Sequence, residues 1–465
     1  MTVPDWVQDA IFYQIFPDRF ANGDRSNDPP NVQRWGSKPK AWNFMGGDLA
    51  GVIQKFDYLL DLGINALYFT PVFQSTSNHR YNATDYFKID PKLGDLRVFQ
   101  SLIHLAHDHK VKVILDGVFN HCGRGFFAFN DILENQQHSP YVKWFHILKF
   151  PVDAYSPGLA SNYLGWWKNK SLPKFNTDNP EVRQYLLDVA RYWIDQGADG
   201  WRLDVPNEID DDSFWAEFRH VVKSANPEAY ILGEIWKADP RWVGEDHFDG
   251  LMNYPVREAI LELLGNGSTF VPGFIAKMEA LAQTYPLQNL QAMYVLLGSH
   301  DTARLFTELG ENLAKIKLAL LIQFAFPGAP AIYYGDEIGL QGDKDPGCRG
   351  AFPWDERHWN QDLFSWVKAL VSVRKSNVTL RRGEIKFLLL DDVQDVLVFV
   401  RQDTQGKVLI TGNPTDHEIQ VSLPVSSLGW EDGSQVHSLL SRQEYLVTQG
   451  TIHLSLSPWN GDWLT

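Results

Sequence analysis

Four clusters of polar residues along the 465-residue chain contain carboxylates, and three of them also contain an imidazole or guanidinium group. The clusters are Asp116–His121, Gly200–Asp204, Gly233–Trp236 and Gly298–Asp301. Each of them forms the end of a short apolar run or directly follows one. A single carboxylate after a strand is usually a cap of the next helix, but four that accompany Arg202, His121 and His300 exceed what capping needs. The combination therefore indicates a functional site.

The apolar runs that lead into these clusters predict a parallel sheet. Short β-rich runs alternate with longer helix-compatible stretches over more than 300 residues, which favours a closed (β/α)8 TIM barrel over an open sheet. The runs are Ala10–Phe16, Ile64–Phe69, Val111–Leu115, Gly200–Leu203, Tyr230–Leu232, Met293–Leu297 and Ala331–Tyr334. They are almost continuously apolar, as strands buried on both faces should be. In such a barrel the residues after the strands meet at the C-terminal face, where substrates bind.

The rest of the chain divides into an insertion and a second domain. Residues 120–176 hold many aromatic side chains with little helical periodicity, so we expect a subdomain inserted after strand three. A helix over Asp362–Arg374 precedes closely spaced strands, which predicts a C-terminal antiparallel β-sandwich over 380–465. Its predicted strands are Ile385–Leu390, Val396–Val400, Lys407–Thr411, Glu418–Leu423, Gln435–Leu440 and Thr451–Leu456. The barrel would comprise residues 1–119 and 177–379.

Composition and charge narrow the classes of function. Hydrophobic residues make up 44% of the chain and aromatic residues 13%, which excludes a disordered or collagen-like protein. The formal charge of -15 would repel a phosphate backbone, so we expect no nucleic-acid partner. The 17 Trp and 17 Tyr side chains serve any core and also suit stacking on sugar rings.

Cysteine usage and the N-terminus bear on the compartment. Cys122 and Cys348 lie far apart, which favours neither a disulfide framework nor a Cys-based zinc site and indicates a reducing compartment. Met1–Trp6 lacks the basic and apolar regions of a signal peptide, and no window approaches about 18 uncharged apolar residues. We therefore expect a cytoplasmic protein with no membrane partner, as a monomer or homodimer.

At the four clusters the chain resembles the α-amylase family of glycoside hydrolases. The clusters match the four signature regions of that family in order. Three further segments agree: NALYFTPVF at Asn65–Phe73, LPKFN at Leu172–Asn176 and GDEIG at Gly335–Gly339. The resemblance implies Asp204 as nucleophile, Glu234 as general acid/base and Asp301 as the carboxylate that fixes sugar hydroxyls. It also implies a substrate-binding set around the scissile sugar, namely Tyr81, Asp116, His121, Arg202, His300 and Arg349.

The implied roles agree with the chemistry of retaining glycosidases. Such an enzyme needs a carboxylate nucleophile about 5 to 5.5 Å from a second carboxyl that first donates and then accepts a proton. Arg202 lies two residues before Asp204 on the same face of a strand, so its charge can hold Asp204 ionised. Ile235 and Trp236 can form a less polar wall that raises the pKa of Glu234.

Two segments indicate one branch of the family. Asn207–Glu208 and the LPKFN segment are similar to the VANE and MPKLN segments of cyclomaltodextrinases, neopullulanases and maltogenic amylases, whereas Pro206 departs from the usual Ala of that branch. The resemblance implies that Asn207 and Glu208 face the acceptor subsites; the alternative is that they only begin a helix.

The same branch implies the substrates. We expect cleavage of α-1,4 bonds, with α-1,6 bonds left open, in maltooligosaccharides, cyclodextrins, pullulan or branched maltooligosaccharides. A debranching enzyme that mainly cleaves α-1,6 bonds and a transglycosidase are the alternatives. Each would use the same three carboxylates on the same fold.

A missing element of that branch bears on access to the site. Its enzymes usually carry an extra β-domain ahead of the barrel, which supports a dimer and covers the active site. The barrel pattern here begins by residue 10, so we expect neither that dimer nor that cover. The insertion would then shape an open cleft, with stacking faces among its aromatic rings and other rings in the core. The candidate rings are Phe126, Phe127, Tyr163, Trp166 and Trp167.

A loop rich in Asn and Asp offers oxygen ligands of the kind that a hard cation prefers. The segment Asn22–Asp28, together with Gly46–Asp48, resembles the calcium loop of the branch. The resemblance implies a structural Ca2+ ion held by Asn22, Asp24, Asn27, Asp28, the Gly46 carbonyl and Asp48. A solvated turn is the alternative. We expect no organic cofactor.

Two interpretations from other classes fit less well. Gly123–Ala128 follows a strand and mimics a dinucleotide fingerprint, but no clear helix is predicted after it and no acidic residue closes a βαβ unit at the expected distance. A non-catalytic carbohydrate-binding protein on the same fold would be expected to have lost a carboxylate, and all three are present.

Overall fold

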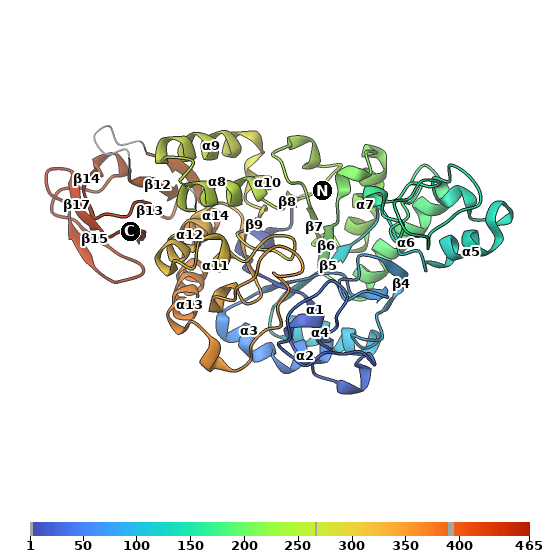
Figure 1. Ribbon diagram of the computed structural model, residues 1–465. Coiled ribbons are helices and arrows are strands. Elements are labelled where there is room, and N and C mark those ends of the chain that lie inside the picture. Colours follow the sequence, from blue (N-terminus) through green and yellow to red (C-terminus); the bar gives the residue numbers. More distant parts are fainter. Residues whose placement is uncertain (1–2, 266, 389–394) are drawn as a thin grey trace.

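The central element is a barrel of parallel strands, in a computed structural model that describes residues 3–265, 267–388 and 395–465. Its strands are β1 (Phe12–Ile15), β2 (Ala66–Phe69), β5 (Lys112–Gly117), β6 (Gly200–Leu203), β7 (Tyr230–Gly233), β8 (Gly250–Leu251), β9 (Tyr294–Leu296) and β10 (Ala329–Tyr333). They pair in the order β8-β7-β6-β5-β2-β1-β10-β9, and a parallel bridge between Met252 and Tyr294 joins the two edges (Figure 1). The expected TIM barrel is thus confirmed.

Each of the seven predicted apolar runs overlaps a barrel strand. The remaining strand, β8, has only two residues, too few to form a recognisable apolar run. The connection from β7 to β8 also departs from the ideal pattern, because the 3-10 helix η7 (Pro240–Trp242) stands there in place of an α-helix. The barrel therefore has its eight strands but an incomplete ring of helices.

Amphipathic helices cover the outside of the barrel (Figure 1). In α4 (Leu96–Asp108), Phe99, Leu102, Ile103 and Ala106 are buried at helical spacing, and Asp95 caps its first turn. The other long helices are α3 (Phe56–Leu62), α6 (Pro180–Asp195), α7 (Asp212–Ala225), α8 (Tyr254–Leu264), α9 (Val271–Thr284), α12 (Leu313–Ala325) and α13 (Gln361–Ser376). Shorter ones are α1 (Pro17–Phe20), α2 (Leu49–Gln54), α10 (Leu287–Leu290), α11 (Leu305–Glu308) and α14 (Val378–Arg382). Among the described residues, no helix is both long and apolar enough to cross a membrane.

Alternation along the strands separates two apolar cores. Tyr13 and Ile15 of β1 belong to the large core between strands and helices. Phe12 points the other way and belongs to a smaller core inside the barrel, with Ile114 and Leu232. The next inward positions toward the carboxyl ends of the strands are polar: Gln14, Asp116, Arg202 and Glu234. A layer of buried polar groups thus lies directly above the apolar filling of the barrel.

Residues 120–176 lie between β5 and α6 and form an irregular unit at one end of the molecule (Figure 1). The unit contains α5 (Phe127–Asn135) and the 3-10 helices η3 (Gln136–His138), η4 (Val142–Trp144) and η5 (Trp166–Lys168). The expectation that no helix follows Gly123–Ala128 is wrong, because α5 does. The helical periodicity of α5 is hard to recognise in the sequence, because the helix is short and because exposed Phe127 stands next to buried Ala128, Phe129 and Ile132.

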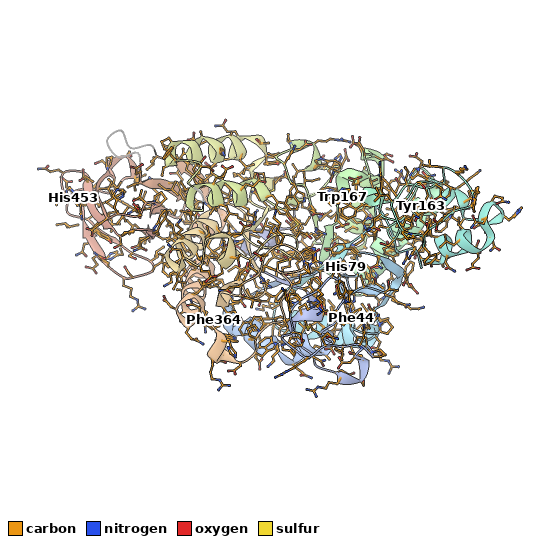
Figure 2. All side chains as sticks on the ribbon, viewed as in Figure 1. Phe44, His79, Tyr163, Trp167, Phe364 and His453 are labelled. Atoms are coloured by element: carbon orange, nitrogen blue, oxygen red, sulfur yellow. The ribbon has the colours of Figure 1, made fainter. Side chains whose placement is uncertain are left out.

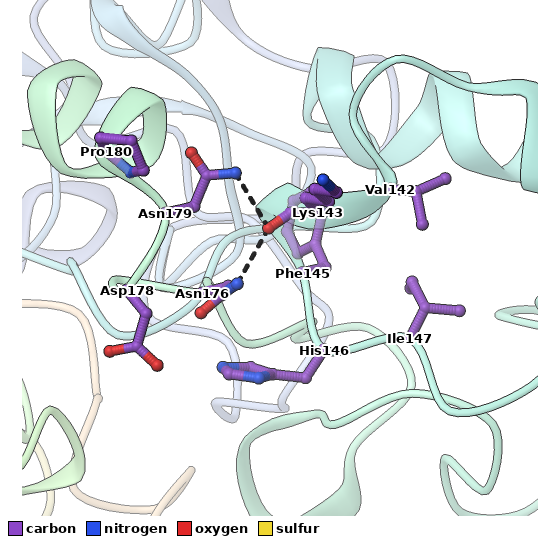
Figure 3. A pocket seen from close by; sticks show the side chains of 9 residues that line it. All are labelled: Val142, Lys143, Phe145, His146, Ile147, Asn176, Asp178, Asn179 and Pro180. Atoms are coloured by element: carbon purple, nitrogen blue, oxygen red, sulfur yellow. Dashed lines mark hydrogen bonds between the residues drawn. The ribbon is translucent and has the colours of Figure 1, made fainter.

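This unit is tied to the start of α6 by two amides. Asn176 and Asn179 donate from their side chains to the Lys143 carbonyl oxygen, at 3.0 and 3.2 Å (Figure 3). An open pocket of about 440 Å³ lies at this junction, with His146 and Asp178 in its lining. On the other side of the cleft, β3 (Phe73–Ser75) and β4 (Ala83–Ile89) form a hairpin that carries Tyr81.

The C-terminal part consists of antiparallel sheets that share an apolar core. Four strands form one sheet: β11 (Glu384–Phe387), β12 (Leu397–Gln402), β13 (Lys407–Asn413) and β18 (Asn460–Leu464). Two pairs complete it: β14 (Ile419–Pro424) with β17 (Thr451–Leu456), and β15 (Gln435–His437) with β16 (Glu444–Leu446). The β-sandwich is confirmed, although residues 389–390 of the first predicted strand lie outside the described residues. Strands β16 and β18 were not predicted, since one has three residues and the other contains Asn, Gly and Asp.

Candidate active site

Arg202 is the centre of the buried polar layer and is fully buried on the inner face of β6. Its Nη1 donates to Asp116 Oδ1 and Oδ2 at 2.8 and 3.0 Å, and to Asp204 Oδ1 at 3.1 Å. Its Nη2 lies 2.9 Å from Glu234 Oε2. Carboxylates from β5 and from the ends of β6 and β7 therefore meet at one guanidinium group.

Asp301 is the fourth carboxylate and the most accessible one. Its side chain is 31% exposed, against 9% for Asp204 and 5% for Glu234. Arg349 Nη2 lies 3.5 Å from Asp301 Oδ1, and Arg349 Nε donates to the His300 carbonyl oxygen at 3.0 Å. The loop after β10 thus holds Asp301 at the rim of the cleft, above the more buried pair.

His300 is held in a stack between the barrel and the β3–β4 hairpin. The Tyr81 ring lies parallel to the His300 ring, with centroids 5.4 Å apart, and the Tyr81 hydroxyl bonds both His300 Nε2 and Asp116 Oδ2. Gln14 Nε2 lies 2.8 Å from His300 Nδ1. Burial lowers the pKa of His300 well below its usual value, so the ring is neutral at physiological pH.

His121 presents an unpaired ring nitrogen to the cleft. Its Nδ1 lies 3.2 Å from Asn120 Nδ2, whereas Nε2 is buried with no partner among the described residues. Burial lowers the pKa of His121 to about 3, which keeps this imidazole neutral as well. A neutral imidazole can donate or accept a hydrogen bond at Nε2, which suits a sugar hydroxyl.

Burial raises the pKa of Asp116, Asp204, Glu234 and Asp301. Arg202 opposes this rise at each carboxyl, but burial outweighs it, and at Asp204 the neighbouring carboxylates raise the pKa further, so the expectation that Arg202 holds Asp204 ionised is not confirmed. The single guanidinium of Arg202 cannot balance the three buried carboxylates that it contacts. The site therefore favours retention of a proton, which is what a general acid requires.

Glu234 is fixed by two donors and an aromatic wall. The Val205 N–H donates to Oε2 at 3.0 Å, and the Trp236 indole N–H donates to Oε1 at 3.1 Å. The Trp236 ring stacks on Tyr254 with centroids 3.8 Å apart. These bonds lower the pKa of Glu234, but burial raises it by more. The expected wall is therefore present, although its indole also contacts the carboxylate.

The segment after Asp204 has an unusual backbone. Val205 adopts a left-handed conformation with φ 37°, which is rare for a β-branched residue and typical of functional sites. The turn aims its N–H at Glu234 and begins the 3-10 helix η6 (Pro206–Glu208). Within η6, Asn207 is exposed and Glu208 is half-buried.

The two segments that indicated the branch of the family meet in space. Lys174 of the LPKFN segment donates to the Glu208 carbonyl oxygen at 2.6 Å, and its Nζ lies 3.7 Å from Glu208 Oε2. This contact joins residues 120–176 to the loop that follows Asp204. Glu208 is thus held beside the cleft by an ion pair as well as by its helical turn.

Three residues of the site were not predicted: Gln14, Tyr68 and Tyr254. The Tyr68 hydroxyl donates to Asp116 Oδ2 at 2.6 Å. Gln14 and Tyr68 each place a polar group inside an apolar run, next to each other in the register of β1 and β2, and this signal could have identified them. Tyr254 follows the two-residue strand β8, where the sequence gives no such signal.

The predicted calcium-loop residues fall into two connected groups. Asn22 Nδ2 donates to Asp28 Oδ1 at 2.8 Å, and a Cβ at Gly46 would lie 2.2 Å from the same oxygen. Asp48 Oδ2 accepts from the Asp24 N–H at 2.8 Å and from Asn27 Nδ2 at 3.0 Å. The loop therefore closes on itself around these six residues.

Two acceptors in this loop fit a bound cation. The side-chain oxygens of Asn22 and Asn27 are buried and have no hydrogen-bond partner among the described residues. Among the residues that the structure describes, no three His, Cys, Asp or Glu side chains converge as metal ligands. An ion here would therefore be held by amide and carbonyl oxygens with at most two carboxylates, an oxygen set that suits Ca2+.

Comparisons with known proteins agree with this geometry. Residues 14–382 match the family model described as the catalytic domain of alpha amylase. The chain is 43% identical over 465 residues to neopullulanase 2 of Thermoactinomyces vulgaris, which covers 99% of this chain and 78% of that protein. A cyclic α-maltosyl-(1→6)-maltose hydrolase from Arthrobacter globiformis is similar over 100% of both chains, with a TM-score of 0.91 and 40% identity. A debranching enzyme from Nostoc punctiforme is similar over 100% of this chain and 99% of that chain, with a TM-score of 0.89 and 40% identity.

Proposed function

The chain belongs to the α-amylase family of glycoside hydrolases, and on that premise we propose that it hydrolyses α-1,4 and α-1,6 bonds in linear, cyclic and branched maltooligosaccharides, with retention of anomeric configuration. The observation that carries the proposal is the single buried guanidinium of Arg202, within 3.1 Å of Asp116, Asp204 and Glu234. A glycosidase of this kind needs two carboxyls with different roles in one water-poor site.

Asp204 is the nucleophile in this mechanism. Its carboxylate attacks the anomeric carbon and forms a glycosyl-enzyme intermediate while the bond to the leaving oxygen breaks. Glu234 donates its proton to that oxygen. Afterwards Glu234 takes a proton from water, which hydrolyses the intermediate and restores both carboxyls. The short contact between Val205 N–H and Glu234 ties the two catalytic segments together.

The other residues hold the reacting sugar. Asp301, the most exposed of the four carboxylates, accepts hydrogen bonds from sugar hydroxyls and stabilises positive charge that develops on the ring. His121 bonds a further hydroxyl as a neutral imidazole through its free Nε2. His300, whose two ring nitrogens bond Gln14 and Tyr81, positions Tyr81, which stacks beneath the sugar. Asp116 and Arg349 act by holding Arg202 and Asp301.

Cleavage of α-1,6 bonds is the finer part of the proposal. It is supported by similarity to a hydrolase named for a cyclic α-maltosyl-(1→6)-maltose and to a debranching enzyme. Glu208, which is half-buried and paired with Lys174, is the side chain that we assign to the acceptor side. Its carboxylate would bond the sugar that leaves or accepts, and so would influence linkage choice and transfer.

We extend the proposal to a structural Ca2+ ion, a cytoplasmic location and a monomer or homodimer. The orphaned oxygens of Asn22 and Asn27 support the ion. Both cysteines are free and buried, which fits a reducing compartment. The ion would hold the loop after β1 and takes no part in the chemistry.

Product analysis tests the proposed activity. Maltoheptaose, β-cyclodextrin, pullulan and branched maltooligosaccharides should all yield short maltooligosaccharides, and proton NMR of fresh product should show the α-anomer. Initial β-anomers would contradict the double-displacement mechanism. Failure on pullulan and branched chains, with activity on maltoheptaose, would restrict the enzyme to α-1,4 bonds.

A further inference from the structure

Stacked rings lead from the catalytic cleft to the surface of the inserted unit. The Trp166 ring lies nearly parallel to His121, with centroids 5.3 Å apart, and the Trp167 ring lies nearly parallel to Trp166 at 4.5 Å. Trp167 is 78% exposed, the largest fraction among the exposed large hydrophobic side chains of the described residues. In Figure 2 it lies on the same side of the molecule as Tyr163, which is also part of the inserted unit, and far from His453 of the C-terminal sheets.

An open groove of about 480 Å³ adjoins these rings. Its lining combines apolar faces with groups that can donate hydrogen bonds: Arg124, Leu159, Trp166, Trp167, Asn169 and Ser171. The Trp166 indole N–H is buried and has no partner among the described residues. The Asn169 side-chain oxygen accepts from the Ser171 N–H and hydroxyl, and its amide nitrogen donates to no described residue. The groove thus offers a free donor, the Asn169 amide, beside a flat ring.

One of the two cations that line the groove is balanced by a carboxylate. Lys170 is paired with Asp153 at 2.8 Å, and the Arg124 guanidinium lies over the Tyr155 ring, 4.3 Å from its centroid. An aromatic platform with donors and little net charge suits a neutral carbohydrate, whose C–H face stacks on the ring while its hydroxyls accept hydrogen bonds.

The backbone at the platform is strained. Trp167 and Lys168 have φ values of 49° and 60°, in the left-handed region that non-glycine residues rarely adopt. This conformation turns a large apolar ring into solvent, where it gains no burial. Strain of this kind persists at sites that bind ligands.

We propose that the groove at Trp166 and Trp167 binds the non-reacting arm of an α-glucan chain whose reacting unit lies in the cleft beside His121. The inference rests on the proposed function and adds a distal subsite to it. The stacked rings connect the cleft to the groove. Trp166 contacts a residue of the catalytic cleft and also stacks on the exposed ring of Trp167. Long or branched chains would reach this subsite, and short substrates would not.

The test compares Trp167→Ala with the wild-type enzyme on maltoheptaose and on nitrophenyl maltoside. We expect the KM for maltoheptaose to rise about three- to tenfold, as for loss of one aromatic stacking contact, with kcat unchanged. The KM for nitrophenyl maltoside should stay within about twofold of wild type. Trp167→Phe, which keeps a ring, should restore most of the affinity.

A matched control removes an exposed ring elsewhere. Phe270 is 74% exposed and directly precedes α9, outside residues 120–176, so Phe270→Ala should leave both KM values unchanged. An unchanged maltoheptaose KM in Trp167→Ala would overturn the subsite. So would a change in oligomeric state measured by analytical ultracentrifugation, since the ring would then serve contact between copies. If the wild-type enzyme cleaves neither substrate, the proposed function itself fails.

Discussion

Asp204→Asn should abolish turnover and at the same time stabilise the fold. An amide cannot attack the anomeric carbon, so activity is lost. The stability effect follows from the surroundings of the carboxylate, since burial and three neighbouring carboxylates raise the pKa of Asp204 despite its contact with Arg202. The charged form is thus disfavoured in the folded protein, and a neutral amide that still accepts from Arg202 removes that cost.

The magnitude can be worked from the size of the protein. Replacing a complete buried ion pair by neutral groups is often neutral or stabilises a fold by about 1 to 4 kcal/mol, and this range applies to Asp204→Asn because Arg202 keeps its contacts with Asp116 and Glu234. Unfolding entropy of roughly 2 cal/mol/K per residue gives about 1 kcal/mol/K for a chain of this length. The melting temperature of Asp204→Asn should therefore exceed that of wild type by about 1 to 4 °C at pH 7.

The pH dependence of the stability difference shows whether it arises from the raised pKa of Asp204. Because the pKa of Asp204 is higher in the folded protein than in the unfolded chain, the folded state binds the proton more tightly. As the pH rises above the ordinary value of 3.8, the wild type loses stability through this group until the folded-state pKa is passed. The advantage of the variant should thus grow from pH 4 to pH 7 and vanish at lower pH.

Differential scanning calorimetry across this pH range is the measurement. Asp246→Asn, at an exposed loop position, is the control and should shift the melting temperature by much less. A lower melting temperature for Asp204→Asn, or a difference that does not change with pH, would refute the reasoning. A lower melting temperature would mean that the contact with Arg202 outweighs burial and carboxylate repulsion, and a difference independent of pH would mean that it does not arise from ionisation of Asp204.

Three further predictions concern the remaining parts of the site. Glu234→Gln should slow cleavage of maltooligosaccharides by about 10²- to 10⁴-fold and should affect aryl maltosides less, because a good leaving group needs little protonation; equal losses in steady-state rates would contradict the acid role. Glu208→His should change the ratio of transfer to hydrolysis at high maltooligosaccharide concentration, and an unchanged product profile would show that Glu208 only forms the turn of η6. EDTA should lower the melting temperature by about 3 °C, for an ion present at about 100 times its Kd, while activity at low temperature survives; no shift, with no metal in elemental analysis, would defeat the calcium site.

The sequence predicts most of the catalytic layer because that layer follows from one rule. In a parallel barrel the residues after each strand share one face, so the carboxylates of Asp116, Asp204 and Glu234 could be brought together without coordinates. The same rule fails at β8, where two residues give no apolar run, and so Tyr254 was missed. It also says nothing of the β3–β4 hairpin, where only the family resemblance identified Tyr81.

Other features of the site depend on contacts that no local pattern encodes. The stack of His121 on Trp166 joins residues 45 positions apart through an irregular unit without long helices or strands. Among the five aromatic rings of the inserted unit considered as stacking faces, Phe126 and Tyr163 are in the core, whereas Trp167 is exposed. Periodicity cannot separate these cases, because burial here is set by the isolated bridges that fold the unit.

Three residues next to the proposed substrate-binding residues have left-handed backbone conformations. Val205 follows the nucleophile in a left-handed conformation, Arg80 does so before Tyr81, and Trp167 does so after Trp166. Arg80 is fully buried and is held by an ion pair with Asp90 at 2.8 Å. Left-handed residues also occur in ordinary surface turns, such as Lys110 after α4, so strain alone does not mark a site. Its coincidence with buried carboxylates at Val205, and with an exposed ring at Trp167, is what assigns these two positions to function.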